Sequence, residues 1–168
     1  SAIRNLGGVQ RLQGNYDAAL DLYFKAFALA EETGDKAGLA NGLSSVGGVY
    51  DELGNYVSAL EYQGKALALW EELGDKRSTA TAINNIGNIY LQQGKHDSAL
   101  VYFRRGLGIA TELKDKSSMM ASFLNMGESN LRLGRFGEAQ TALEEGLVLA
   151  YALEAKDWVV FGDRKSVV

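Results

Sequence analysis

The chain has 168 residues, of which 46% are hydrophobic and 23% are charged, and its formal net charge is −4. It contains no cysteine, which excludes disulfides and thiolate metal sites. Its charge balance lacks the basic excess that draws proteins to phosphate backbones, and no apolar run approaches the roughly 20 residues of a membrane-spanning helix. No signal-peptide pattern opens the chain. We therefore expect a cytoplasmic protein with no nucleic-acid partner and no membrane partner.

A repeat of about 40 residues organises the sequence. When the chain is shifted by this period, Gly34-Asp35-Lys36 aligns with Gly74-Asp75-Lys76 and with Lys114-Asp115-Lys116. Such self-similarity is typical of a solenoid, in which each unit packs on the next. We place the repeats at about 1–33, 34–73, 74–113 and 114–155. The chain begins without methionine and inside a repeat, so we expect it to be a fragment of a longer protein.

Each repeat predicts a pair of helices. In the third repeat, Ile83, Ile86, Ile89 and Tyr90 recur at a spacing of three and four residues, which places them on one helical face. Gly94 follows where a glycine can end a helix, and a second apolar pattern runs over 99–109. In chain order we predict helices near 2–13, 16–33, 36–53, 56–73, 76–93, 96–113, 116–133 and 136–154.

Residues 156–168 follow the fourth repeat, and we expect a partial capping helix or tail there. Trp158 and Phe161 would form a lid, because the open end of a solenoid otherwise exposes its core. Partner binding is the alternative role for this segment. The final residues, 162–168, show no periodicity.

Glycines occupy one shared position in the first helix of each repeat, where glycine costs about 1 kcal/mol relative to alanine. These residues are Gly7, Gly47, Gly87 and Gly127. We expect the missing side chain to let the second helix of the same repeat approach closely. The residues predicted at this contact are Ala19, Ala59, Ala99 and Ala139.

These patterns resemble the tetratricopeptide repeat, whose helix-turn-helix units carry W-x2-L-G-x2-Y followed by A-x3-F. The matching residues of the third repeat are Ile83, Ile86, Gly87, Tyr90, Ala99 and Phe103. The unit departs from the family pattern because it lacks the terminal proline and is longer than about 34 residues, as in a long, 40-residue repeat subclass. The resemblance implies an all-α, right-handed superhelical solenoid of about four helix-turn-helix repeats over 1–155, plus a C-terminal cap segment.

The resemblance also implies that the first helices line a concave surface. Asparagines are frequent on these helices, and a carboxamide both donates and accepts, so a row of them can pair with the backbone of an extended peptide. Alternatively, the series that contains Asn85 bonds the backbone of the neighbouring repeat and only stiffens the stack. The predicted peptide-binding residues are Asn5, Asn84, Asn85, Asn88, Asn125, Glu128, Arg4 and Asp51.

We therefore interpret the chain as a noncatalytic scaffold that binds a protein or an extended peptide. One alternative is a sensory or regulatory module of a larger signalling protein, since long-repeat proteins of this kind resemble the sensory halves of histidine kinases and nucleotide cyclases. Another is a self-association module that stacks through the solenoid ends. We expect no cofactor, no metal site and no catalytic residue, because the chain has one histidine and no convergent set of polar residues.

Overall fold

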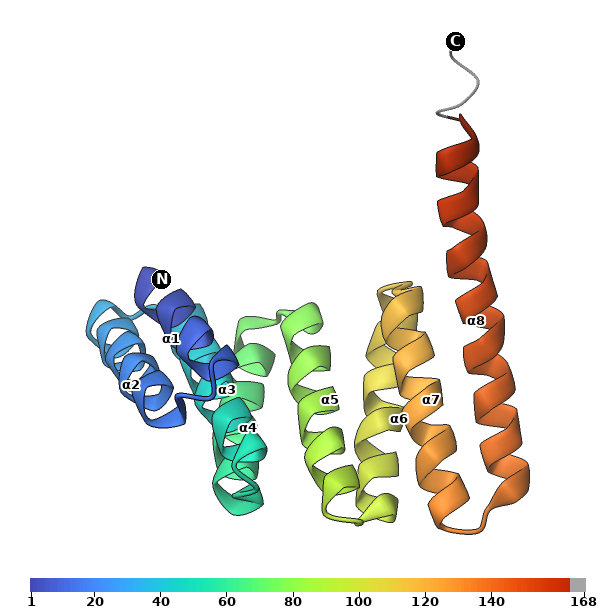
Figure 1. The fold of residues 1–168 in the computed structure, drawn as a ribbon, viewed down its shortest axis with the longest axis horizontal. Coiled ribbons are helices and arrows are strands. Elements are labelled where there is room, and N and C mark those ends of the chain that lie inside the picture. Colours follow the sequence, from blue (N-terminus) through green and yellow to red (C-terminus); the bar gives the residue numbers. More distant parts are fainter. Residues whose placement is uncertain (164–168) are drawn as a thin grey trace.

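The computed structural model describes the backbone of residues 1–163 and the side chains of residues 1–153. Within residues 1–163 it has eight α-helices and no strand: α1 (Ala2–Leu12), α2 (Tyr16–Thr33), α3 (Lys36–Glu52), α4 (Tyr56–Leu73), α5 (Lys76–Gln92), α6 (His96–Glu112), α7 (Lys116–Arg132) and α8 (Phe136–Asp163). The helices form four hairpins that stack along one axis (Figure 1). This confirms the predicted helical solenoid of four repeats, and α1 to α7 begin and end within one residue of their predicted bounds.

Left-handed residues and aspartate caps separate the helices. Gly94 turns the chain between α5 and α6 with φ 70°, and Gly74 does so between repeats with φ 68°. Asp75 then caps α5, because its Oδ1 accepts from the backbone N–H of Ser78 at 3.1 Å. At the third junction Lys114 stands where the first two have Gly34 and Gly74, and it too is left-handed, with φ 55°.

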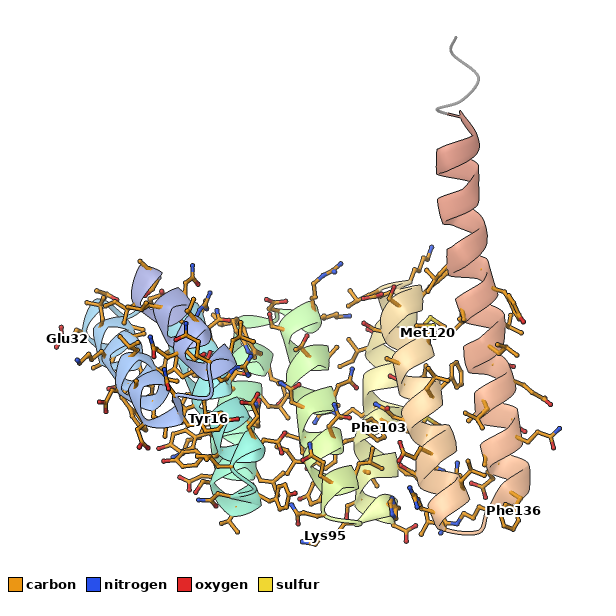
Figure 2. All side chains as sticks on the ribbon, viewed as in Figure 1. Tyr16, Glu32, Lys95, Phe103, Met120 and Phe136 are labelled. Carbon is orange, nitrogen blue, oxygen red and sulfur yellow. The ribbon has the colours of Figure 1, made fainter. Side chains whose placement is uncertain are left out.

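The glycines inside the first helices allow the predicted close approach. A Cβ atom on Gly87 would lie 2.7 Å from Cε1 of Phe103, which is closer than real Cβ atoms come. Phe103 lies between the two helices of its hairpin (Figure 2). At two of the other repeats a predicted alanine does meet the glycine, since the carbonyl oxygens of Ala59 and Ala139 lie 3.3 Å and 3.6 Å from a Cβ placed on Gly47 and on Gly127. Ala99 is fully buried, but the residue one helical turn later shares its face and has the reach to cover the glycine.

In each of the two inner hairpins, a pair of stacked tyrosines joins the first helix to the second. Tyr50 and Tyr62 stack at 5.5 Å between ring centroids, and Tyr90 and Tyr102 stack at 5.4 Å. The fourth repeat has Asn130 in the position of Tyr50 and Tyr90, and this side chain is 2% exposed. Its Oδ1 has no hydrogen-bond partner among the described residues. The last repeat therefore buries an unpaired polar atom where the inner repeats bury an aromatic pair.

The last helix differs from its predicted bounds. We expected a second helix to end near residue 154 and a capping segment to start at 156, but α8 continues from Phe136 to Asp163 and extends beyond the other helices (Figure 1). Glu154 and Ala155 stand where earlier junctions have glycine or lysine and then aspartate, so both stop signals are missing. The side chains of Trp158 and Phe161, the predicted lid, lie outside the described residues. No helix of residues 1–163 is both long enough and apolar enough to cross a membrane.

Candidate functional site: a polar groove across three repeats

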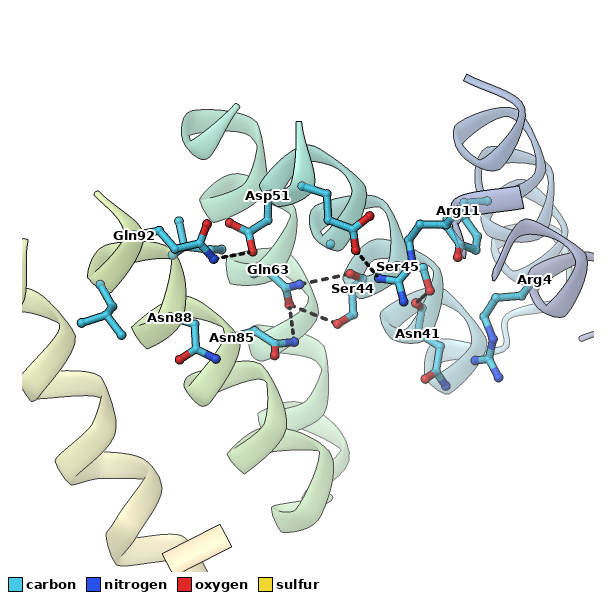
Figure 3. Close-up of a pocket in the computed structure, with 15 residues that line it drawn as sticks. Arg4, Arg11, Asn41, Ser44, Ser45, Asp51, Gln63, Asn85, Asn88 and Gln92 are labelled. Atoms are coloured by element: carbon cyan, nitrogen blue, oxygen red, sulfur yellow. Dashed lines mark hydrogen bonds and ion pairs between the residues drawn. The ribbon is translucent and has the colours of Figure 1, made fainter. Parts of the chain in front are cut away.

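A cavity of about 510 Å³ opens between the first helices of the first three repeats. Its walls are mostly polar side chains from α1, α3 and α5, with Ile89 and Leu91 of α5 among them, and its floor includes Tyr23 from α2 and Gln63 from α4. Figure 3 shows these side chains turned toward one open space. We call this cavity the groove. Its volume falls in the range of about 300–1,000 Å³ that is typical of ligand sites.

Gln63 forms a polar floor beneath the groove. It is 2% exposed and lies over Gly47 in the position that Tyr23 and Phe103 occupy in their own repeats. Its Nε2 donates to the Ser44 carbonyl oxygen at 3.1 Å, and its Oε1 accepts from Ser44 Oγ at 3.1 Å (Figure 3). Both ends of the buried carboxamide are therefore paired, so burial of this polar group is not strongly unfavourable.

In the groove, charged side chains of one repeat contact polar or charged side chains of the next. Arg11 Nη1 lies 3.4 Å from Glu52 Oε1, and Gln92 Nε2 donates to Asp51 Oδ2 at 3.2 Å. Burial raises the pKa of the Asp51 carboxyl, and the hydrogen bond from Gln92 opposes this effect. Arg11 Nε and Asp51 Oδ1 are buried with no hydrogen-bond partner among the described residues. Perturbed and incompletely paired polar groups of this kind are commoner at functional sites than elsewhere.

Half of the predicted site residues meet in the groove. These are Arg4, Asp51, Asn85 and Asn88. The other four, Asn5, Asn84, Asn125 and Glu128, lie outside its lining. Asn84 turns away, because its Oδ1 lies 2.5 Å from the place that a Cβ on Gly106 of α6 would take. Asn5 and Glu128 are exposed at opposite ends of the solenoid.

The asparagine series also joins successive repeats. Asn125 Nδ2 donates to Asn88 Oδ1 at 3.2 Å, and Asn85 Nδ2 approaches Gln63 Oε1 at 3.5 Å. The alternative interpretation of this series predicted bonds to the backbone of the neighbouring repeat, but these bonds end on side chains. Asn85 and Asn88 therefore take part in the stack while they also line the groove.

The lining residues that were absent from the predicted site include Asn41, Ser44, Gln63 and Gln92. The sequence could have indicated Gln63 as a site residue, because it is polar at a repeat position that is tyrosine, phenylalanine or leucine in the other repeats. Gln92 occupies the same repeat position as Glu52, which lies one repeat earlier and is also polar. Among the residues with described side chains, no group of three acidic or histidine residues could hold a metal ion.

The stacked hairpins and the groove across their first helices define the chain as a helical repeat protein. The profile of the tetratricopeptide repeat family matches residues 1–72, 40–112 and 78–152. These overlapping segments cover nearly the whole chain, so it belongs to the tetratricopeptide repeat family. No curated protein matches the sequence at a significant level.

Several solved structures share the fold. BtubC (BKLC) from P. vanneervenii is 22% identical with a TM-score of 0.83, and the match covers 90% of this chain and 63% of that one. Aspartyl phosphate phosphatase F from Bacillus subtilis is 16% identical with a TM-score of 0.87, over 90% and 40% of the two chains. A Rap protein complexed with competence and sporulation factor is 22% identical with a TM-score of 0.72, over 88% and 42%. The likeness shows the fold alone, and this chain spans less than two thirds of each protein.

Proposed function

We propose that this chain is a noncatalytic scaffold that binds an extended segment of a peptide or protein in the groove. The observation that carries the proposal is the convergence of amide side chains from successive repeats, Asn41, Asn88 and Gln92, on one open cavity. The fold itself suggests a protein-interaction scaffold. The Rap structure with the same fold is a complex with competence and sporulation factor, which supports a binding role without identifying a ligand for this chain.

The size of the groove fits a short extended segment. Directly packed helices lie about 8–10 Å apart, and the first helices of successive repeats make few contacts with one another, so three of them span at least roughly 20 Å. An extended chain covers about 3.3 Å per residue, so roughly six residues fit across them. Amide groups can donate to and accept from the backbone of such a segment without requiring one particular side chain.

The charges of the groove favour a segment of mixed or low charge. Arg4 and Arg11 lie on α1, whereas Asp51 and Glu52 lie on α3, so the groove is positively charged at the first repeat and negatively charged at the second. An acidic segment would meet Arg4 but be repelled by the carboxylates of the next repeat. We therefore propose a ligand other than a strongly acidic or strongly basic tail.

Selection from a random peptide library followed by mapping tests this function. Peptides selected on the wild-type chain should shift the side-chain amide NMR signals of Asn41, Asn88 and Gln92. Amides on the outer surface, such as Gln140 of α8, should keep their signals. If selected peptides shift only residues outside the groove, or if none can be selected, the proposed groove function is wrong.

A further inference from the structure

Two of the four charged side chains that line the groove have no partner of opposite charge. Arg11 and Glu52 form an ion pair at 3.4 Å, so their charges largely cancel. Arg4 and Asp51 also line the groove, but neither forms an ion pair within residues 1–153. The groove therefore keeps one positive and one negative group that a ligand of complementary charge would neutralise.

The charge of Arg4 belongs to the groove because of the position of this residue in the repeat. Residues at the same position in later repeats turn toward the second helix of their own repeat. Ser44 donates to Gln63 at 3.1 Å, and Asn84 Oδ1 lies 2.5 Å from a Cβ placed on Gly106. Arg4 has a longer side chain at this position of α1, and it reaches the groove (Figure 3).

Asp51 has an oxygen atom that no described protein group uses. Its Oδ2 accepts from Gln92 Nε2 at 3.2 Å, whereas its Oδ1 has no hydrogen-bond partner among the described residues. Gln92 is neutral, so it leaves the negative charge uncompensated. Burial raises the pKa of the Asp51 carboxyl, and what opposes this shift is the hydrogen bond from Gln92. A cationic ligand group would supply both the missing charge and a donor.

The two unpaired charges lie diagonally across the groove. Arg4 is near the start of α1, whereas Asp51 is near the end of α3. In the second repeat the position of Arg4 is Ser44, seven residues before Asp51, which is about 10 Å along the helix. The step from α1 to α3 adds at least about 10 Å, so the charges are roughly 15 Å apart. At about 3.3 Å per residue, an extended segment spans this separation with roughly four or five residues.

We propose that the segment bound in the groove carries one carboxylate and one cationic side chain roughly four residues apart, with the carboxylate on Arg4 and the cation on Asp51. Beside these charges α3 presents the uncharged side chains of Asn41, Ser44 and Ser45. Polar groups of this kind suit the backbone of the segment and set its direction. The two charges are therefore recognised in one order along the segment. This inference rests on the proposed binding function and specifies the chemistry of the ligand.

Capped heptapeptide libraries with two fixed positions test this inference. Two libraries carry Glu and Lys four residues apart, one in each order. The others carry Glu and Glu, Lys and Lys, or Gln and Gln at the same positions, and all have uncharged residues elsewhere. Fluorescence anisotropy on the wild-type chain should show one order of Glu and Lys binding at least tenfold more tightly than the Gln library, because two charge pairs form in a partly buried groove. The opposite order and both like-charged libraries should bind more weakly than the preferred order.

A charge swap tests which residues recognise the two charges. Arg4→Glu/Asp51→Lys keeps the net charge and the amides of the groove, so the preferred order of Glu and Lys should reverse. Glu61→Lys/Lys65→Glu is the matched control, because it swaps an exposed ion pair on α4 and should keep the wild-type order. Asp51→Asn keeps the shape of the side chain. It should abolish the preference for Lys over Gln and retain the preference for Glu.

Circular dichroism should show the helical content of the wild type in each variant, and Asp51→Asn alone decides if the swapped chain does not fold. The charge inference is wrong if the swap keeps the wild-type order or if Asp51→Asn keeps the preference for Lys. A Gln library that binds as tightly as the preferred order and shifts the amide NMR signals of the groove overturns the charge inference but leaves the binding function standing. If no library shifts these signals, both the inference and the proposed function fail.

Discussion

Gln63 and Ser44 are joined by two hydrogen bonds of 3.1 Å beneath the groove, one to the Ser44 carbonyl oxygen and one from its hydroxyl. The second repeat thus has a polar side chain under its glycine where the other repeats have Tyr23, Phe103 and Leu143. The consequence is local. The groove lies above the hydrogen-bonded amide of Gln63 rather than above an apolar side chain. Asn85 Nδ2 lies 3.5 Å from Oε1 of this amide.

Gln63→Glu should lower the free energy of unfolding by about 3 kcal/mol at pH 8, because it buries a charge and removes the donor to the Ser44 carbonyl. Burial should raise the pKa of this carboxyl above the usual value of about 4.3. The loss is therefore present above the raised pKa and shrinks as pH falls through it. Urea unfolding of variant and wild type at several pH values between 5 and 8 measures this, and a constant difference would contradict the polar-floor account.

Gly87→Ala should lower the free energy of unfolding by about 1 kcal/mol or more, because the added Cβ would lie 2.7 Å from the Phe103 ring. Gly108→Ala is the matched control, since a Cβ there has no neighbour within 4 Å. That variant should gain up to about 1 kcal/mol from helix propensity. Urea unfolding of the two variants should move in opposite directions. Equal shifts would refute the close contact between the helices.

Lys114→Gly should raise the free energy of unfolding by up to about 1 kcal/mol, because Lys114 adopts a φ of 55° that glycine adopts without strain. Gly34 and Gly74 already fill the equivalent positions. Lys114→Gln removes the charge but keeps the strain, so its stability should stay near that of the wild type. Thermal unfolding compares the three proteins. A glycine variant no more stable than the glutamine variant would contradict the strain.

Asp75→Ala should cost about 1 kcal/mol at neutral pH, because it removes the cap on α5. Hydrogen bonds from Ser78 lower the pKa of the Asp75 carboxyl. A lowered folded-state pKa means that this stabilisation is complete above the unfolded value of about 3.9 and is lost as pH falls through the folded value. The gap between wild type and variant, measured by denaturant unfolding from pH 6 downward, should close in acid. Asp75→Asn keeps a capping side chain and should remain near the wild type at pH 6.

The sequence carried most of the architecture in local signals. The aspartates before α3, α5 and α7 and the left-handed glycines predicted helix ends to within a residue. The continuation of α8 was not predicted, and its sequence signal is that Glu154 and Ala155 replace the glycine or lysine and the aspartate of the earlier junctions. The site was harder to predict. Asn84 and Asn85 are neighbours on one helix, so their side chains point about 100° apart. Asn84 packs against Gly106 of α6, whereas Asn85 lines the groove, and the sequence pattern did not distinguish the two.

The central claim is that amide groups of the groove hold an extended segment, and one affinity comparison tests it most directly. A peptide selected on the wild type is titrated by calorimetry into the wild type, into Asn41→Ala/Asn88→Ala, and into Lys65→Ala, a control on the outer side of α4 whose ammonium pairs with Glu61 of the same helix. Loss of two hydrogen bonds at about 0.5–1.5 kcal/mol each should raise the Kd of the double variant roughly 5- to 150-fold, with Lys65→Ala unchanged. Equal affinity for the double variant and the wild type, with both folded, would contradict the account.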